Sequence, residues 1–325
     1  MRDRGVFIMI AVALAAALLI AIAYREDSGR PRGMDKVVAI FKTSGTANAF
    51  WESVSEGVES GAQDFGFDVT FRSPRDEIYV DEQMAIVRSA IAERPAAIVL
   101  AASDFHQLVG PVREAKAEGI KVVCVDSFIE TEDADAKIGT DNFEAGQKCG
   151  AALLRLLPQG SRVAVMSYVQ GSSTAIGRET GLRDSLGDRL EVTGTSYSSS
   201  DERIAYEQAK AILAHEPALA GIAALNLPTT LGAARALQES GRQGKIALVV
   251  FDSSPEVLRL MERGVIQDAI VQKPFNMGYI SMETVRALLS GKKPKPYTNT
   301  GSVDVDKANM FDPENQKLLF PVSGP

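Results

Sequence analysis

Polar side chains follow almost every apolar run of this 325-residue sequence. They are acids, amides, hydroxyls and two lysines: Lys42, Thr43, Ser44, Ser103, Asp104, Asp126, Ser127, Gln170, Ser172, Ser173, Asn226, Asp252, Ser253, Gln272 and Lys273. A carboxylate accepts hydrogen bonds from two hydroxyls, and an amide donates and accepts at once. The set therefore suits a neutral polyhydroxylated ligand. Each residue taken singly could instead cap a helix or close a turn.

Two aromatic side chains stand side by side in the stretch "TANAFWES". Trp51 lies three residues before Val54, so on a helix it could extend the apolar stripe that faces the core. Phe50 is rotated by about 100° from Trp51 on the same helix and cannot face that core equally. An aromatic face can also cover the C–H-rich face of a sugar ring while polar groups bind its hydroxyls. Both interpretations stay open for Trp51, whereas Phe50 favours a ligand.

The sequence shows few signs of a catalytic site. The sequence has no G-x-S-x-G elbow, G-x-G-x-x-G fingerprint or Walker A loop. His106 and His215 are predicted on the surface, and neither follows an apolar run, so a nucleophile would lack a base. Cys124 and Cys149 read as small buried side chains, although an oxidising compartment allows a disulfide. We therefore expect no enzyme, no metal and no cofactor.

The charge of the chain excludes two classes of partner. Its net charge is −7, and it contains no run of basic residues. It therefore lacks the electrostatic footprint of a nucleic-acid-binding protein and the polybasic patch that binds anionic lipid.

Residues 1–32 read as a signal or anchor segment followed by a linker. Residues 6–23 carry no charge. Their length exceeds that of a secretory apolar region, about 7–15 residues, and lies at the short end of the range for a spanning helix, about 17–25. Ala21 and Ala23 form an A-x-A-like cleavage site, yet the length slightly favours an uncleaved anchor. Either way, we expect the rest of the chain to be exported.

From Lys36 onward, short β-branched apolar runs alternate with amphipathic segments. Nearly continuous apolar runs indicate strands that are buried on both faces of a parallel sheet. The series runs twice, over about 36–140 and 160–272, and about 290 residues exceed what one core usually supports. The sequence therefore predicts an α/β fold with two doubly wound parallel-sheet lobes, then a strand from Ser302 and an irregular tail. Ligands of such sheets bind beyond the carboxyl ends of the strands, where the polar residues stand.

Several segments together resemble a known family. They include "TANAFWESVSEGVESGAQDFGFDV", "IGTDNFEAGQKCG", "GRETGLRDSL" and "VVFDSSPEVLRLMERG". The chain resembles the periplasmic sugar-binding proteins of ABC importers, of the ribose- and galactose-binding type (type I periplasmic binding proteins), over residues 36–301. The resemblance implies two lobes joined by three hinge crossovers. Its boundaries would be 36–140 plus 273–301 for the N-terminal lobe, 141–272 plus 302–313 for the C-terminal lobe and 314–325 for the tail.

The resemblance also implies a set of ligand-binding residues. Asn48 would hydrogen-bond the ligand, and Phe50 and Trp51 would stack on it. The remaining polar contacts would come from Asp126, Arg178, Asn226, Asp252 and Gln272.

Three positions make ribose itself a poor match. Ribose binders usually have arginine where this chain has Ser127, and a further stacking aromatic where it has Ser200. Lys42 at the end of the first strand, together with Asp126, is similar to receptors for the furanosyl autoinducer of bacteria. A solvated strand end is the other interpretation of Lys42.

The function implied is capture of a sugar or sugar-like polyol in the cleft, by a monomer, for delivery to an ABC permease. The alternative is a membrane-tethered sensor of a sugar or furanosyl autoinducer that presents its closed state to a histidine kinase or chemoreceptor. The same fold forms the effector domain of LacI-type repressors. We reject a repressor, because an apolar segment occupies the place of the helix-turn-helix.

Overall fold

The computed structural model describes residues 34–43 and 49–319. The described residues from Lys36 onward belong to one compact unit. The predicted signal segment at 6–23 and the candidate ligand residue Asn48 lie outside the described residues. None of the helices within the described ranges is long and apolar enough to cross a membrane.

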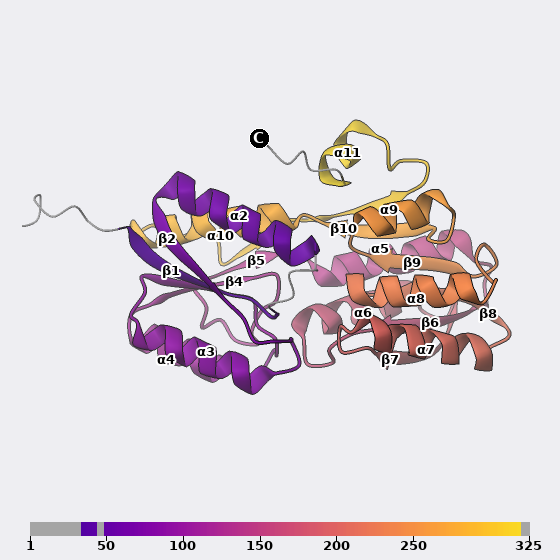
Figure 1. Ribbon diagram of the computed structural model, residues 1–325, viewed down its shortest axis with the longest axis horizontal. Coiled ribbons are helices and arrows are strands. Elements are labelled where there is room, and N and C mark those ends of the chain that lie inside the picture. Colours follow the sequence, from indigo (N-terminus) through magenta and orange to yellow (C-terminus); the bar gives the residue numbers. More distant parts are fainter. Residues whose placement is uncertain (1–33, 44–48, 320–325) are drawn as a thin grey trace, which may run out of the picture. The chain divides into compact units, whose positions relative to one another are not determined.

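The N-terminal lobe is built on a sheet whose strands run in the order β2, β1, β3, β4, β5, β11 (Figure 1). These are Phe67–Arg72, Asp35–Ile40, Ala97–Leu100, Lys121–Val125, Ala136–Gly139 and Tyr297–Asn299. Helices α2 (Ala49–Phe65) and α10 (Pro274–Leu289) cover one face, and α3 (Val80–Ala92) and α4 (Val109–Ala117) cover the other. Alternate side chains of β1 enter the two cores, which explains why its apolar run is continuous.

The C-terminal lobe repeats this order with β7, β6, β8, β9, β10 and β12. These strands are Glu191–Tyr197, Arg162–Ser167, Leu219–Ala224, Ala247–Phe251, Asp268–Gln272 and Ser302–Asp306. The helices are α5 (Asn142–Leu156) and α6 (Ser173–Leu186) on one face, and α7 (Glu202–His215), α8 (Leu227–Glu239) and α9 (Pro255–Glu262) on the other. Strand β12 pairs antiparallel with β10, and the other strand pairs of this sheet are parallel. The predicted fold of two doubly wound parallel-sheet lobes is confirmed.

Within the described residues the chain passes between the lobes three times. The passages lie between β5 and α5, between β10 and α10, and between β11 and β12. As a result α5 packs on α6 in the C-terminal lobe, and α10 packs on α2 in the N-terminal lobe.

Glycines allow these two helix pairs to approach backbone to backbone. A Cβ on Gly57 or Gly278 would lie 2.1 Å from a carbonyl oxygen of the facing helix. In the other lobe, the distances would be 2.2 Å for Gly146 and 2.0 Å for Gly181. Each helix of each pair therefore contributes one glycine that no larger residue can replace without moving backbone.

Strands β5 and β11 and the last helix differ from the sequence prediction. The two strands have four and three residues, too few for a periodic pattern, and neither was predicted. Helix α11 (Pro313–Leu319) stands where an irregular tail was expected. Proline suits the first turn of a helix, Glu314 pairs with Lys317 at 3.1 Å, and Leu319 packs into the core of the C-terminal lobe.

The two cysteines are buried and free, as the sequence indicated for small buried side chains. Cys124 lies in β4 and Cys149 in α5, so each lobe holds one. Burial raises the pKa of the Cys124 thiol to about 12 and also raises that of Cys149.

Replacing Gly278 with alanine is expected to lower the free energy of unfolding by about 1–3 kcal/mol, because the new methyl group meets the backbone of Val54 and Val58. Gly110→Ala in α4 is the matched control, since nothing lies within 4 Å of its added Cβ. Alanine there should raise stability by up to about 1 kcal/mol. Urea denaturation measures both. Equal effects of the two substitutions would contradict the close approach of α2 and α10.

Candidate ligand-binding site

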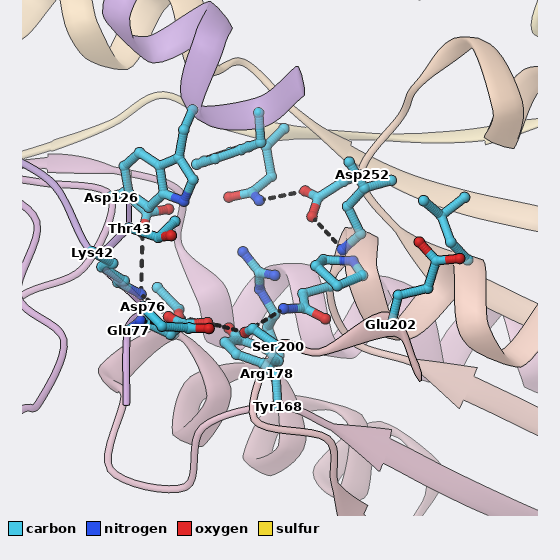
Figure 2. Close-up of a pocket in the computed structure, with 18 residues that line it drawn as sticks. Lys42, Thr43, Asp76, Glu77, Asp126, Tyr168, Arg178, Ser200, Glu202 and Asp252 are labelled. Atoms are coloured by element: carbon cyan, nitrogen blue, oxygen red, sulfur yellow. Dashed lines mark hydrogen bonds and ion pairs between the residues drawn. The ribbon is translucent and has the colours of Figure 1, made fainter. Parts of the chain in front are cut away.

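A cavity of about 280 Å³ lies where the carboxyl ends of the strands of both lobes meet (Figure 2). Its lining includes every residue proposed from the sequence except Asn48, which lies outside the described residues. These are Lys42, Phe50, Trp51, Asp126, Arg178, Asn226, Asp252 and Gln272. The structure thus brings together residues from Lys42 to Gln272, which are 230 positions apart in the sequence.

A left-handed backbone turn places an acid in the cavity from each lobe. Asp126 follows β4 with φ of 61°, and Asp252 follows β9 with φ of 68°. Such values are uncommon for residues other than glycine, and they cluster where function requires strain. The amide nitrogens donate to Ile138 and Ile270, at 2.9 and 3.0 Å, on the next strand of each sheet. The two acids therefore occupy equivalent positions of the internal repeat.

Lys42 is buried rather than solvated at the end of its strand. Its Nζ lies 3.5 Å from Asp126 Oδ2 and 3.6 Å from Glu77 Oε2. It also donates a hydrogen bond of 3.1 Å to Ser172 Oγ in the C-terminal lobe. An ammonium that is buried and shared by two carboxylates holds the acidic side of the cavity together.

Gln83 hydrogen-bonds the backbone at the strand end next to Lys42. This fully buried side chain of α3 donates from Nε2 to the carbonyl oxygens of Phe41 and Ala101, at 3.0 and 2.8 Å. Its Oε1 accepts from the amide of Ser103 at 2.8 Å. The carboxyl ends of β1 and β3 are thereby tied together next to the cavity.

In the C-terminal lobe, Asp252 is held by neutral donors. Its Oδ1 accepts from Gln272 Nε2 at 2.7 Å, and its Oδ2 accepts from the amide of Leu227 at 3.1 Å. Burial raises the pKa of Asp252, and the charge of Arg178 opposes that rise. Gln272 Oε1 is a buried acceptor without a hydrogen-bond partner among the described residues. This acceptor is therefore available to a donor from outside the described part of the chain, such as a ligand hydroxyl.

Arg178 and Asn226 are fixed by their own hydrogen bonds. Arg178 donates from Nε to Asn142 Oδ1 at 2.8 Å and from Nη1 to the Leu225 carbonyl at 2.7 Å. Its guanidinium carbon lies 4.5 Å from the ring centre of Phe251. Asn226 caps α8 through Oδ1, as the capping alternative predicted, yet its Nδ2 remains directed at the cavity and donates to Ser200 Oγ at 3.0 Å.

Trp51 belongs to the core and also lines the cavity, and stacking on a ligand stays a prediction. Its ring stacks on Phe41, with centroids 5.2 Å apart, and belongs to the core of the N-terminal lobe. Its other neighbour is Phe50, which meets it edge-on at 5.2 Å. Both Phe50 and Trp51 line the cavity and give it an apolar wall beside the charged one.

Several lining residues were missed from the sequence, among them Asp76, Glu77, Tyr168 and Ser200. Asp76 and Glu77 lie in the loop after β2, and Ser200 lies after β7; both are edge strands with weak apolar runs. Applying the rule of strand ends to these two strands as well would have identified the loops. Ser200 was noted only because an aromatic residue was expected there.

Glu77 is the most informative of these missed residues. It is 7% exposed, and burial raises the pKa of its carboxyl group. Figure 2 shows its side chain between Lys42 and Ser200, so it connects the two walls of the cavity.

Comparison with known proteins agrees with this geometry. A family model described as "Periplasmic binding protein domain" matches residues 38–293. The D-ribose/D-allose-binding protein of Pseudomonas aeruginosa is 24% identical over 297 residues, which cover 88% of this chain and 91% of the relative.

Two solved structures have the same fold over nearly their whole length. A solute-binding protein of an ABC transporter from Agrobacterium vitis, with bound D-fucose, aligns with a TM-score of 0.85 and 31% identity, over 88% of this chain and 100% of the other. A carbohydrate transporter solute-binding protein from Agrobacterium radiobacter, in complex with D-arabinose, aligns with a TM-score of 0.84 and 26% identity, over 89% and 99%. The match of the family model over most of the chain, with the repeated lobes and the cavity between them, shows that this protein belongs to the periplasmic binding protein family.

Proposed function

We propose that the protein captures a monosaccharide or sugar-like polyol in the cavity and delivers it, outside the cytoplasm, to the permease of an ABC importer. The observation that carries this proposal is the convergence of buried acceptors from both lobes. Asp126, Asp252 and the unpartnered Oε1 of Gln272 line one cavity with an aromatic wall. Such a lining matches a ring with an apolar face and hydroxyl groups at its rim.

The relatives support the size and class of the ligand. The Agrobacterium proteins bind D-fucose and D-arabinose in their structures, and both are uncharged monosaccharides. A cavity of about 280 Å³ suits a ligand of that size better than an oligosaccharide.

Closure of the lobes on the ligand follows from the placement of the lining residues. We propose hinges at the three chain passages, near 140–141, 272–273 and 301, which divide the lobes at the boundaries given by the sequence. The two lobes also contact each other directly. The Phe105 amide of the N-terminal lobe donates to Gly171 O of the C-terminal lobe, and the Phe128 amide donates to Ser173 Oγ, both at 2.9 Å. Only a closed state makes these contacts together with both sets of ligand contacts, so a ligand shifts the population toward it.

We propose binding without chemistry. His106 and His215 are exposed and do not line the cavity. Lys42 forms ion pairs with both Glu77 and Asp126. Recovery of unchanged sugar after incubation with the protein tests this directly.

Asp252→Ala is expected to weaken binding of the best-bound sugar by at least about tenfold, because it removes a buried acceptor for ligand hydroxyls. The measurement is isothermal titration calorimetry with D-fucose, D-arabinose, D-ribose and D-allose. Asp188→Ala is the matched control, since Asp188 is exposed and does not line the cavity. Circular dichroism checks that both variants fold. Wild-type affinity in a folded Asp252→Ala variant would overturn the assignment of this acid to the site.

Trp51 is the sole tryptophan, so its emission should change when sugar binds. Trp51→Ala should weaken binding by at least about tenfold, because the sugar loses an aromatic face. Trp51→Phe keeps such a face and should lose less affinity. Calorimetry reads both variants, and exposed Tyr79→Phe serves as a control. Binding by folded Trp51→Ala at wild-type strength would leave Trp51 with its core role alone.

A further inference from the structure

The buried charges around the cavity do not balance. Among the described lining residues that are buried, Lys42 and Arg178 are cations, and Glu77, Asp126 and Asp252 are acids. Residues 44–48 read Ser-Gly-Thr-Ala-Asn and carry no ionisable side chain. One acid therefore lacks a matching cation. A buried, unmatched carboxylate is costly, so either the acid is neutral or the ligand brings a positive charge.

Glu77 is the acid of this set that contacts both lobes. It reaches from a loop of the N-terminal lobe to Ser200 of the C-terminal lobe, whose hydroxyl donates to Glu77 Oε1. Ser199 and Ser200 both have left-handed backbone, with φ of 56° and 58°, and this turn directs Ser200 into the cavity. Strain at two successive residues other than glycine indicates that the contact has a role in binding.

The groups that face Glu77 leave its negative charge poorly matched. Lys42, after β1, is the cation in contact with it, but Lys42 is shared with Asp126 after β4. Asp76, on the same loop, adds a second negative charge. Tyr168 and Arg178, from β6 and α6, act only from a greater distance.

The rest of the loop offers no further cation. Arg75 lies over the ring of Tyr79 at 3.7 Å and pairs with the exposed Glu82. Burial accordingly raises the pKa of Glu77.

We propose that Glu77 is a specificity-determining binding residue that enters the closed cleft as a neutral carboxylic acid, so that capture of the ligand takes up one proton from solvent and selects uncharged sugars. This inference rests on the proposed function. With Glu77 neutral, Lys42 balances Asp126, and Arg178 balances Asp252. An anionic sugar, such as a uronate, would then meet two carboxylates, whereas an uncharged sugar leaves the balance intact.

The sign of the pH dependence follows from closure. In the open cleft Ser200 would no longer cover Glu77, so the pKa of its carboxyl group would be closer to its ordinary value than in the closed cleft. Closure raises that pKa. Between the two values the closed state binds a proton that the open state lacks, so affinity rises as the pH falls, by at most about tenfold per pH unit. Below the ordinary value the dependence on Glu77 disappears.

Calorimetry of the whole exported chain tests the proposal. The best-bound uncharged sugar of the panel is titrated between about pH 5.5 and 8 in two buffers with different ionisation enthalpies. The difference in observed heat gives the number of protons taken up. We expect uptake approaching one proton, and weaker binding at higher pH.

Glu77→Gln keeps the shape of the neutral acid and removes its titration. We expect proton uptake near zero, an affinity that no longer varies with pH, and at pH 8 an affinity equal to or greater than that of the wild type. Glu118→Gln changes an exposed acid of the same lobe and should behave as the wild type. Full proton uptake in Glu77→Gln would show that another acid takes up the proton, and it would overturn the proposal.

Other outcomes separate the two proposals. An uncharged sugar that binds without proton uptake overturns the role of Glu77 and leaves sugar capture intact. Preference for D-glucosamine over D-glucose without proton uptake shows that the ligand supplies the missing cation, and it also overturns the neutral acid. If no sugar of the panel binds, sugar capture itself fails. The proton count on the wild type needs no variant, so a count near zero overturns the proposal even if Glu77→Gln does not fold.

Discussion

The closed cleft depends on one buried ammonium group. Lys42 lies between Asp126 and Glu77 and donates to Ser172 of the opposite lobe, so a single cation serves two acids and a contact between lobes. Burying such a group costs several kcal/mol unless partners surround it. Gln83 holds the strand ends beside it, and the left-handed turn at Asp126 supplies one of its partners. Lys42 lies near both acids on this side of the cavity, so its charge reduces any repulsion between them.

The sequence predicted the sheets and most strand-end residues because both follow from burial. A strand covered on both faces must be apolar throughout, and the residue after it must turn at the ligand edge. Glu77 and Ser200 escaped prediction because they follow edge strands, which are half exposed and show no continuous apolar run. Their importance lies in a contact between two loops 123 positions apart, and no local pattern encodes such a contact. The short β5 and β11 were missed for the same reason, since their pairing partners rather than their composition make them strands.

Trp51 shows why two hypotheses about one residue need not compete. At the first turn of α2, a side chain can turn one face to the core and another to the cavity. Phe41 stacks on one side of the indole, and Phe50 meets it edge-on, so its position is fixed by packing before any ligand arrives. An aromatic wall held in this way loses little conformational freedom on binding. Asn226 likewise has two roles. Its side-chain oxygen caps helix α8, and its side-chain nitrogen donates to Ser200 in the lining of the cavity.

The helices α5 and α10 follow the fifth strands of the two sheets, and each packs in the other lobe. The halves of the repeat have thus exchanged a helix within one chain, as two subunits do in a domain swap. Neither half of the sequence, cut at the repeat, contains all the elements of one lobe. The glycine contacts of α2 with α10 and of α5 with α6 form only after the chain has passed the boundary. The two lobes therefore depend on each other's part of the sequence, and we expect them to fold together.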